Sequence, residues 1–383
     1  MPGPRILFLV HHPIEDASSR YRIYQFIPKL EMEGFTCDVR PFTTAKLFHA
    51  IRRGGNLPLK LSHTLFATIR RALELSRLGS YDLVLIHREA FPFFSPLVEN
   101  AIMKRHPKVL FSFDDAVYVG HDRNTMHYSW LYRFKYGSGI DRVIQKAALV
   151  IAGSPVLADY AQKYTDNIAV MPTVVDLERY PFTLPQERPD GSITVGWYGS
   201  NSTSPYLDMI VPALQRLAAA HPGKIRFRFY GDHRLSLPLS DFQAFPFRLE
   251  TEIQDLQSMD IGLMPLPDTA WTRAKCAFKA IQYMALGMPT VLTPIGMSGE
   301  LVQHGENGLH ATTVDEWFDA LNWLVSNLRL RQSISLAGRK TIEEQYSLQG
   351  WAPRFANLMR AIMEERPVEP YGVALQQETT ACR

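Results

Sequence analysis

The chain has 383 residues, of which 46% are hydrophobic and 21% charged, a composition that supports folded domains and excludes wholesale disorder. Its 41 basic and 38 acidic side chains leave a formal charge of +3, too balanced for a dedicated nucleic-acid binder. The three scattered cysteines, Cys37, Cys276 and Cys382, form no CxxC pair and so indicate neither a disulfide framework nor a zinc cluster. We expect a cytoplasmic protein of two or three domains.

Short apolar runs alternate with helical patterns through the first half of the chain. Continuous apolar runs of this kind are typical of strands in a parallel sheet that helices cover on both faces. The expected strands cover residues 6–10, 37–42, 83–86, 109–113 and 149–152.

A helix is predicted over residues 18–33, between the first two strands, because apolar residues recur there at helical spacing. We expect Ser18 or Ser19 to cap its start and Gly34 to end it. Pro28 lies inside the pattern, so we expect a kink or a break at that proline.

The second half of the chain repeats the alternation of strands and helices. Strands are expected over residues 193–198, 225–230, 261–265 and 290–293. Helices are expected after Ser204-Pro205 and over residues 252–258, 276–286, 314–327, 330–345 and 349–363. Two blocks of alternation predict two doubly wound α/β domains.

The domain boundaries follow from a proline-containing segment without periodicity, residues 173–191, which is typical of a linker. It separates an N-terminal domain over residues 1–172 from a C-terminal domain over residues 192–348. A last helix belongs to residues 349–365, and residues 366–383 form a polar tail that we expect to be mobile.

The segment 275–289 holds two lysines near the start of a predicted helix. Lys275, Lys279 and Gln282 recur at i, i+4 and i+7, so we expect them on one helical face. Arg273 lies just before them. Backbone N–H groups and the helix dipole add to the lysine charges and attract an anion. The residues predict a diphosphate site, and two solvated lysines on an ordinary helix are the alternative.

Residues 275–310 resemble the donor-site segment of the family 4 glycosyltransferases, which are retaining, sugar-nucleotide-dependent enzymes. The stretch reads KCAFKAIQYMALGMPTVLTPIGMSGELVQHGENGLH. It keeps the family pattern, in order, at Met284, Ala285, Gly287, Pro289, Gly296, Glu300, Gly305, Asn307 and Gly308. The resemblance implies an α/β protein with the GT-B fold, two Rossmann-like doubly wound domains facing across a cleft. It also implies that the C-terminal helix crosses back to the N-terminal domain.

Two departures from the family pattern mark a divergent sub-branch. The family glutamate that holds the donor ribose falls on Gln282, and the glutamate that contacts the transferred sugar falls on Ala274. An amide can still hydrogen-bond a hydroxyl, although it carries no charge. Asp268 or Lys275 is expected to replace the glutamate that contacts the transferred sugar.

The resemblance places the other donor contacts at the ends of two strands. The family's basic pair after the strand at residues 193–198 is missing, which leaves the phosphates to Arg273, Lys275 and Lys279. The loop after the strand at residues 225–230 is expected near the nucleotide base. The donor residues expected in these loops are Gly199, Ser200, Asn201, Tyr230 and Asp232. A plain strand-to-loop turn is the alternative for Asp232.

Asp114 and Asp115 are the expected catalytic residues, because they fall where the family often has a histidine that faces the reacting sugar. A carboxylate there can orient an acceptor hydroxyl or stabilise a developing positive charge. A helix-capping role is one alternative. A metal site with His121, Asp122 and His127 is another, but the spacing matches no standard ligand set and we expect no metal.

The loop after the first strand is expected on the acceptor or phosphate side, through His11, Ser19 and Arg20. In the family, this loop approaches the donor phosphate and the acceptor. Arg20 is expected to serve an anionic group, with an ordinary surface arginine as the alternative.

The resemblance implies transfer of a hexose-type sugar from a UDP- or GDP-sugar to a glycan or lipid-linked acceptor, with retention. The setting would be cell-envelope or polysaccharide biosynthesis, with no cofactor and no nucleic-acid partner. The alternatives are a GT-B-fold sugar-nucleotide epimerase or hydrolase, and a non-catalytic sugar-nucleotide-binding protein.

Residues 46–78 form a basic amphipathic segment in which Glu74 is the one acid and Leu65, Ile69 and Leu73 make a stripe. Such a segment can dock on an anionic membrane, here the inner face. A helix packed on its own sheet is the alternative. The basic residues are Lys46, Arg52, Arg53, Lys60, Arg70, Arg71 and Arg77.

Overall fold

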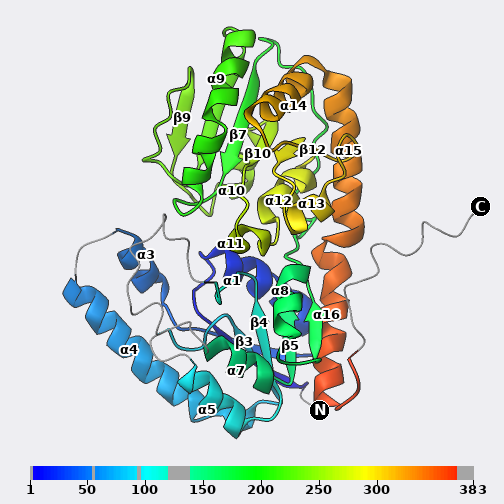
Figure 1. Ribbon diagram of the computed structural model, residues 1–383. Coiled ribbons are helices and arrows are strands. Elements are labelled where there is room, and N and C mark those ends of the chain that lie inside the picture. The colour runs from blue at the N-terminus through cyan, green and yellow to red at the C-terminus, as the bar shows by residue number, and fades with distance from the viewer. Residues whose placement is uncertain (1–2, 54–56, 93–95, 120–138, 369–383) are drawn as a thin grey trace, which may run out of the picture. The chain divides into compact units, whose positions relative to one another are not determined.

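The computed structural model describes residues 3–53, 57–92, 96–119 and 139–368, except for the side chains of residues 51–53, 57 and 59. The chain divides into two compact units. Unit 1 comprises residues 1–173 and 351–383, and unit 2 comprises residues 174–350. Each unit contains a six-stranded parallel sheet with helices around it (Figure 1), which confirms the predicted α/β class.

The sheet of unit 1 has the strand order β2-β1-β3-β4-β5-β6, with parallel neighbours throughout. The strands are β1 (Arg5–Val10), β2 (Thr36–Pro41), β3 (Leu83–His87), β4 (Val109–Phe113), β5 (Leu149–Ala152) and β6 (Ile168–Val170). The first five confirm the predicted strands, and β6 was missed because three residues carry no pattern. Strands β2 and β3 lie on opposite sides of β1, so the strand order reverses between β1 and β3.

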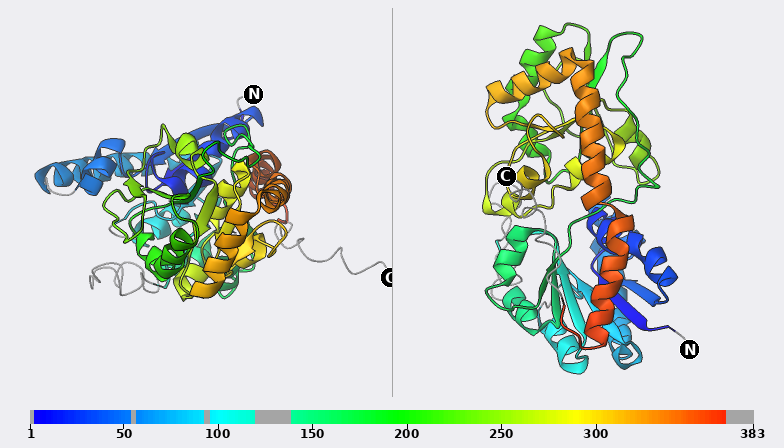
Figure 2. Two further views of the ribbon diagram at one scale, coloured as in Figure 1. Left: turned by 90° about the horizontal axis from the view of Figure 1, so that it is seen from above. Right: turned by 90° about the vertical axis from the view of Figure 1, so that its right-hand side faces the viewer.

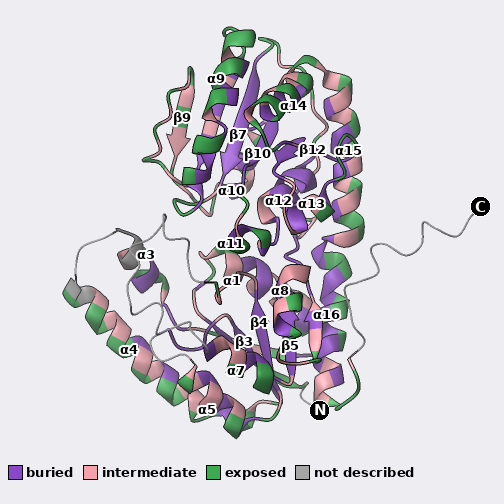
Figure 3. Cartoon of the chain, in the orientation of Figure 1, coloured by how far each residue is buried: buried purple, intermediate pink, exposed green. Residues whose placement is uncertain are grey.

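Helices of unit 1 surround this sheet. They are α1 (Ala17–Arg22), the 3-10 turn η1 (Tyr24–Phe26), α2 (Ile27–Met32), α3 (Ala45–Arg53), α4 (Leu57–Leu75), the 3-10 turn η2 (Leu78–Ser80), α5 (Leu97–Arg105), α7 (Gly139–Lys146) and α8 (Pro155–Ala161). Figure 3 shows the buried strands of the sheet and an exposed outer side on α4.

The helix predicted over residues 18–33 is interrupted, but the break is not at Pro28. Ile23 leaves helical geometry with φ −127° and ψ −64°. Pro28 instead lies in the first turn of α2, where its missing N–H breaks no helical hydrogen bond. The cap at the start is also not a serine, because the Asp16 carboxylate accepts from the Ser19 N–H at 3.1 Å. Gly34 follows the end of α2, as predicted.

The last described helix, α16 (Leu348–Met363), belongs to unit 1 from Trp351 onward. Phe355 packs edge-on against Phe26, with ring centroids 5.1 Å apart. The Arg360 guanidinium pairs with the Glu33 carboxylate at 2.9 Å. Figure 2 shows α16 beside the elements of unit 1. The C-terminal helix thus completes a unit whose other residues lie at the start of the chain.

The sheet of unit 2 has the strand order β12-β11-β10-β7-β8-β9, again with parallel neighbours throughout. The strands are β7 (Ile193–Tyr198), β8 (Ile225–Tyr230), β9 (Phe242–Phe245), β10 (Ile261–Met264), β11 (Thr290–Leu292) and β12 (Leu309–His310). The four predicted strands are confirmed, and the short β9 and β12 were missed. The strand order reverses between β7 and β10.

Helices of unit 2 pack around its sheet. They are the 3-10 turn η3 (Ser204–Met209), α9 (Val211–Ala220), α10 (Glu252–Gln257), α11 (Ala270–Arg273), α12 (Phe278–Leu286), α13 (Met297–Leu301), α14 (Val314–Ser326) and α15 (Leu328–Gln345). The helix expected after Ser204-Pro205 begins later than predicted, since these residues start a 3-10 turn and the α-helix begins at Val211. Among the described helices, none has the length and apolar character to cross a bilayer.

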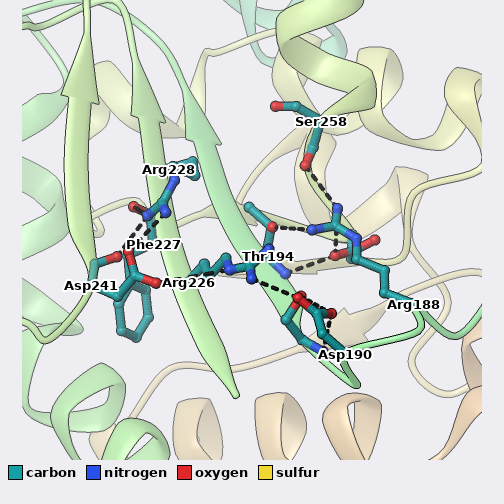
Figure 4. Close-up of polar contacts among 10 residues, drawn as sticks. Arg188, Asp190, Thr194, Arg226, Phe227, Arg228, Asp241 and Ser258 are labelled. Atoms are coloured by element: carbon teal, nitrogen blue, oxygen red, sulfur yellow. Dashed lines mark hydrogen bonds and ion pairs between the residues drawn. The ribbon is translucent and has the colours of Figure 1, made fainter. Parts of the chain in front are cut away.

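The segment that enters unit 2 is fixed at the amino ends of the strands. The Arg188 guanidinium donates to the Thr194 hydroxyl at 2.9 Å and pairs with the Asp260 carboxylate at 3.0 Å (Figure 4). Asp190 accepts from the Arg226 guanidinium at 2.6 Å. These contacts hold residues 188–190 at the edge opposite the carboxyl ends of the strands.

Helix α12 is pinned to the strands on both sides of the reversal in unit 2. The Tyr283 hydroxyl accepts from the Tyr198 N–H at 2.8 Å and donates to the Leu263 carbonyl at 3.4 Å. Its ring crosses Gly262, where a Cβ would lie 2.4 Å from the ring, so only glycine fits. This contact sets the position of the helix that carries Lys279.

Candidate functional site

In open parallel sheets, ligands bind at the carboxyl ends of the strands where the strand order reverses. That edge lies beyond β1 and β3 in unit 1 and beyond β7 and β10 in unit 2. The predicted site residues fall mostly into these two edges, which are described one after the other.

The edge of unit 1 holds five polar residues in one hydrogen-bonded group, which we call the edge cluster. The Ser18 hydroxyl donates to the Asp114 carboxylate at 2.6 Å and lies 2.8 Å from His87 Nε2. Arg88 Nε donates to the other oxygen of Asp114 at 2.6 Å. Arg88 also pairs with Asp115 through its NH2 group. The cluster therefore joins α1 to the ends of β3 and β4.

Charge and burial fix the protonation of the edge cluster. Burial lowers the pKa of His87 to about 4, with Asp114 opposing and Arg88 and Arg22 adding to this effect, so His87 is neutral near pH 7. Burial alone would raise the pKa of Asp114, but the charge of Arg88 holds it well below its usual range. A carboxylate that stays ionised in this way is a poor proton acceptor and a good hydrogen-bond acceptor.

His11 and His12 follow β1 at the same edge. Their rings stack with centroids 3.9 Å apart. His11 Nδ1 lies 3.8 Å from the buried Glu89 carboxylate, beyond hydrogen-bond distance but close enough for an ionic attraction when the ring is protonated. His11 is thus held at the edge where it was expected.

Ser19 and Arg20 lie at this edge but are turned into the protein. Ser19 is buried and its N–H is used by the Asp16 cap. Arg20 is only 2% exposed, and its NH1 group donates to the carbonyls of Ile14 at 2.9 Å and Glu15 at 3.3 Å. The burial of Arg20 therefore opposes the expected contact with an anionic group. The alternative of a surface arginine is wrong.

The edge of unit 2 brings the two predicted lysines onto tryptophan rings. The Lys279 ammonium lies 5.9 Å from the centre of the Trp197 ring, and the Lys275 ammonium lies 5.4 Å from that of Trp271. These are cation–π distances. Trp197 belongs to β7 and Trp271 to α11, so both cations are held at the carboxyl edge of the sheet.

The expected single helical face of Lys275, Lys279 and Gln282 is wrong for Lys275. Helix α12 begins at Phe278, after Ala277 takes left-handed backbone angles with φ 50°. Lys275 lies in the turn between α11 and α12 and approaches the edge from outside the helix.

Gln282 is buried inside unit 2, which opposes the contact with the donor ribose that its place in the family pattern implies. Its Nε2 group donates to the Tyr180 hydroxyl at 2.7 Å and to the Glu252 carboxylate at 3.3 Å. Both partners are buried. A glutamate at position 282 would set a second carboxylate against Glu252, which gives a physical reason for the departure from the family pattern.

Gly199 follows β7 at a point where three segments meet. A Cβ there would lie 2.2 Å from the Trp197 ring and 2.8 Å from Lys279 Cε. Gly231, with φ 111°, follows β8 and packs on the Gly199 carbonyl, which a Cβ would approach to 1.7 Å. The predicted donor residues Gly199 and Lys279 are therefore in contact, and the glycines let the loops close around the lysine.

The remaining donor residues are partly occupied within unit 2. Tyr230 is buried, stacks on Phe245 and places its hydroxyl 2.9 Å from the Ser258 hydroxyl. Asp232 accepts from the Ser204 hydroxyl at 2.7 Å. These contacts oppose an exposed, ligand-facing Tyr230.

Four more donor residues lie on the exposed side of the edge. Asp268 and Arg273 form a bidentate ion pair at 2.5 and 2.8 Å. Ser200 contacts Ser202 between hydroxyls at 2.8 Å, and Asn201 is exposed. An Asp268 that is paired with Arg273 can replace a lost sugar-binding glutamate only if that pair opens.

Sequence reasoning missed three edge residues that the structure brings together, Ser18, His87 and Arg88. The signal for the last two was present, because His87 ends a predicted strand and Arg88 follows it directly. The rule about strand ends applied to them as much as to Asp114. Ser18 was named as a helix cap, and its contact with His87 and Asp114 depends on tertiary structure.

The metal site that the sequence offered as an alternative for Asp114 and Asp115 also requires His121, Asp122 and His127. Those three residues lie outside the described residues. Within the described ranges, no group of three or more histidine, cysteine, aspartate or glutamate residues is arranged to hold a metal ion.

The chain has the GT-B fold, as comparison with solved structures shows. It matches the Anabaena HepE structure in complex with UDP and glucose with a TM-score of 0.61 and 16% identity, over 94% of this chain and 100% of that chain. It matches sucrose-phosphate synthase from Thermosynechococcus elongatus with a TM-score of 0.65 and 14% identity, over 95% and 100%. For α,α-trehalose 6-phosphate synthase from Burkholderia multivorans the values are 0.61 and 12%, over 95% and 100%.

A sequence signal for a protein family covers much of unit 2. Residues 193–327 match the family described as Glycosyl transferases group 1, which supports a glycosyltransferase. The match spans less than half of the chain and includes the lysines of the unit 2 edge. A sequence search of curated proteins finds no match.

Proposed function

We propose that the protein is a glycosyltransferase that uses a nucleotide-diphosphate sugar as donor. The observation that carries the proposal is the family match over residues 193–327, together with two lysines held at the carboxyl edge inside that match. Transfer of a sugar leaves a diphosphate with growing negative charge. Lys275 and Lys279 stabilise that charge, and the start of α12 adds its dipole.

The donor we propose is a UDP- or GDP-hexose. The fold relative from Anabaena is described in complex with UDP and glucose, and in another structure with UDP-glucose, which makes UDP-glucose the first donor to test. In this proposal Gly199, Ser200, Asn201 and Asp232 surround the nucleotide, and Asp268 or Arg273 contacts the sugar or the phosphates.

The acceptor side belongs to unit 1 in this proposal. The edge cluster contacts an acceptor glycan or lipid-linked sugar. We further propose retention of anomeric configuration, chemistry without a metal, and a place in polysaccharide or cell-envelope biosynthesis. A sugar-nucleotide epimerase or hydrolase and a non-catalytic binding protein are the alternatives.

The test begins with calorimetry of the full chain against a panel of UDP- and GDP-sugars. The proposal requires binding of at least one of them below millimolar concentration, and no binding to any of them rejects it. Product analysis with a panel of acceptor sugars then separates the alternatives. Donor consumption without a new glycosidic bond favours the epimerase or hydrolase, and binding without consumption favours the binding protein.

The membrane contact expected through residues 46–78 is also proposed here, in a revised form. Five large apolar side chains on α4 are more than half exposed and recur at helical spacing, so they share one face. They are Leu61 (61%), Leu65 (61%), Phe66 (58%), Ile69 (53%) and Leu73 (64%). The alternative of a helix packed on its sheet through this stripe is therefore wrong.

The basic residues of α4 are turned away from the apolar stripe. Arg71 is buried, donates to the Arg40 carbonyl at 2.9 Å and pairs with Glu74 at 3.1 Å. Arg70 donates to the Phe42 carbonyl at 2.9 Å. The stripe itself is uncharged, while Lys46 and Arg77 nearby are exposed. We therefore propose that α4 lies on an anionic bilayer mainly through its apolar face.

Vesicle flotation tests this contact. We expect the protein to float with vesicles of phosphatidylglycerol and phosphatidylcholine, and to keep most of this binding at high salt. Replacing Leu65 and Phe66 with glutamine should abolish it, whereas Leu336→Gln, at a 55% exposed position on α15, should not. Two results contradict the proposal. One is flotation that the α4 substitutions leave unchanged, and the other is a wild-type dimer that the same substitutions dissociate.

A further inference from the structure

Asp114 and Asp115 are adjacent in sequence but differ in their surroundings. Asp114 uses both carboxylate oxygens inside the edge cluster, one for Arg88 and one for Ser18, each at 2.6 Å. Its side chain is 9% exposed. Asp115 also pairs with Arg88, and its side chain is 23% exposed. Asp114 is thus an internal anchor, and Asp115 is the member of the pair that reaches the surface.

We propose that Asp115 accepts a hydrogen bond from an acceptor-sugar hydroxyl and that Arg88 is the positioning residue that holds it there. This inference rests on the proposed glycosyltransferase function. It assigns the two predicted catalytic aspartates to different tasks, and it adds Arg88, which was not among the predicted site residues.

The backbone of Arg88 supports a positioning role. Arg88 has φ 61°, a left-handed conformation that is uncommon for a residue other than glycine. Its N–H donates to the Ser112 carbonyl of β4 at 2.8 Å, which fixes the turn after β3. In that conformation the guanidinium extends to two carboxylates at once. Lysine, with one compact ammonium group, cannot reproduce this two-point contact.

The charges around the cluster indicate what kind of group Asp115 binds. Three carboxylates, Asp16, Asp114 and Asp115, interact there with two guanidinium groups, Arg22 and Arg88. A carboxylate repels phosphate and favours a hydroxyl donor, which suits an acceptor sugar rather than the donor diphosphate.

The experiment compares Asp115→Asn, Asp114→Asn and Arg88→Lys in the full chain. UDP-glucose binding is measured by calorimetry, and UDP release is followed with increasing concentrations of acceptor sugars from the panel above. For Asp115→Asn we expect a loss of roughly 10–100-fold in kcat/KM for the acceptor, the usual cost of one hydrogen bond to a charged group. Its donor Kd and its melting temperature should not change.

Arg88→Lys should show the same loss of acceptor kcat/KM as Asp115→Asn, although the side chain at position 88 does not contact the substrate. Arg88→Gly should regain part of the activity when guanidinium ion is added at millimolar concentration. A residue with a merely structural role would not show this rescue. Asp114→Asn should lower the melting temperature, because the Asp114 carboxylate holds both Ser18 and Arg88.

Three results overturn the inference. They are an unchanged acceptor kcat/KM in Asp115→Asn, a larger catalytic loss in correctly folded Asp114→Asn than in Asp115→Asn, and no guanidinium rescue of Arg88→Gly. A wild-type protein that binds no nucleotide sugar rejects the proposed function, and the inference with it. A wild type that transfers sugar while Asp115→Asn is unaffected rejects the inference alone.

Discussion

The two sheets have reversed strand orders and polar carboxyl edges, but they hold their charges differently. In unit 1, the carboxylates of Asp114 and Asp115 are bound by a guanidinium group in a part-buried cluster. In unit 2, the ammonium groups of Lys275 and Lys279 lie over aromatic rings. A ring orients a cation without neutralising it, whereas an ion pair cancels most of both charges.

This difference suggests how one fold divides two tasks. An edge that neutralises its own charges offers hydrogen bonds in a fixed geometry. An edge that holds lysines over aromatic rings places positive charge where an anion can bind. The following predictions test that contrast, beginning with the largest expected effect.

Removing an ion-pair partner should affect the two edges very differently. Asp114→Ala leaves the part-buried Arg88 with one remaining aspartate, so we expect a loss of about 3–5 kcal/mol in the free energy of unfolding. Asp268→Ala breaks an exposed ion pair with Arg273 and should leave stability unchanged within error. Denaturant unfolding of both variants measures this, and equal losses would remove the contrast between the edges.

The neutral, buried His87 should make stability depend on pH. Its pKa is lowered from 6.5 to about 4 in the folded protein, so below pH 6.5 the unfolded chain gains a proton that the folded chain does not. Stability should fall by about 3 kcal/mol from pH 6.5 to 4 and then level off. Urea unfolding at several pH values measures this.

The control for this pH dependence is His87→Gln, which should lose most of the slope. His310, whose pKa burial also lowers, remains in both proteins and cancels in the comparison. The low pKa of Asp114 acts in a different window, because its contribution is lost only below its usual value near 3.8. An identical slope in the variant would show that His87 is not the responsible group.

Restoring the family glutamate at position 282 should destabilise unit 2. Gln282→Glu places a second carboxylate beside buried Glu252, and we expect a loss of about 2 kcal/mol at pH 7. The exchange variant, Glu252→Gln with Gln282→Glu, should recover most of it because it again has one carboxylate and one amide. Thermal unfolding of the three proteins tests this, and no recovery would show that the pair is not coupled.

The lysine on the Trp197 ring should discriminate phosphate from nucleoside. Lys279→Ala should weaken UDP binding by about tenfold, the effect of one charge-assisted contact, and leave uridine binding nearly unchanged. Lys340→Ala, at an exposed position on α15, is the matched control and should alter neither. Equal losses for UDP and uridine in calorimetry would contradict a phosphate role.

The sequence predicted the strands and their edges well because both depend on local patterns. Buried parallel strands such as β1 and β4 are unbroken apolar runs, and ligand-binding edges follow directly from where these runs end. The two lysines were identified from another local pattern, their place near the start of a predicted helix. The sequence also indicated the apolar face of α4 through the helical spacing of its apolar residues. Spacing alone does not indicate whether other parts of the protein cover that face.

The failures concern side-chain direction and backbone angles, which neighbours in space determine. Gln282 has the spacing of an exposed helical residue, yet Tyr180 and Glu252 enclose it. Lys275 lies outside the helix because Ala277 adopts a left-handed conformation, which the sequence does not predict for an alanine. Arg88 lies in a similar conformation, and its pairing with two aspartates depends on the alignment of β3 with β4.

The path of α16 has a consequence for how the protein is made. Unit 1 begins with the first residues of the chain, but Phe355 and Arg360 must arrive before Phe26 and Glu33 gain their partners. Unit 2 is continuous in sequence and can fold while the chain is still being synthesised. All residues of unit 2 are therefore synthesised before the last segment of unit 1, and Phe26 and Glu33 lack Phe355 and Arg360 until that segment follows.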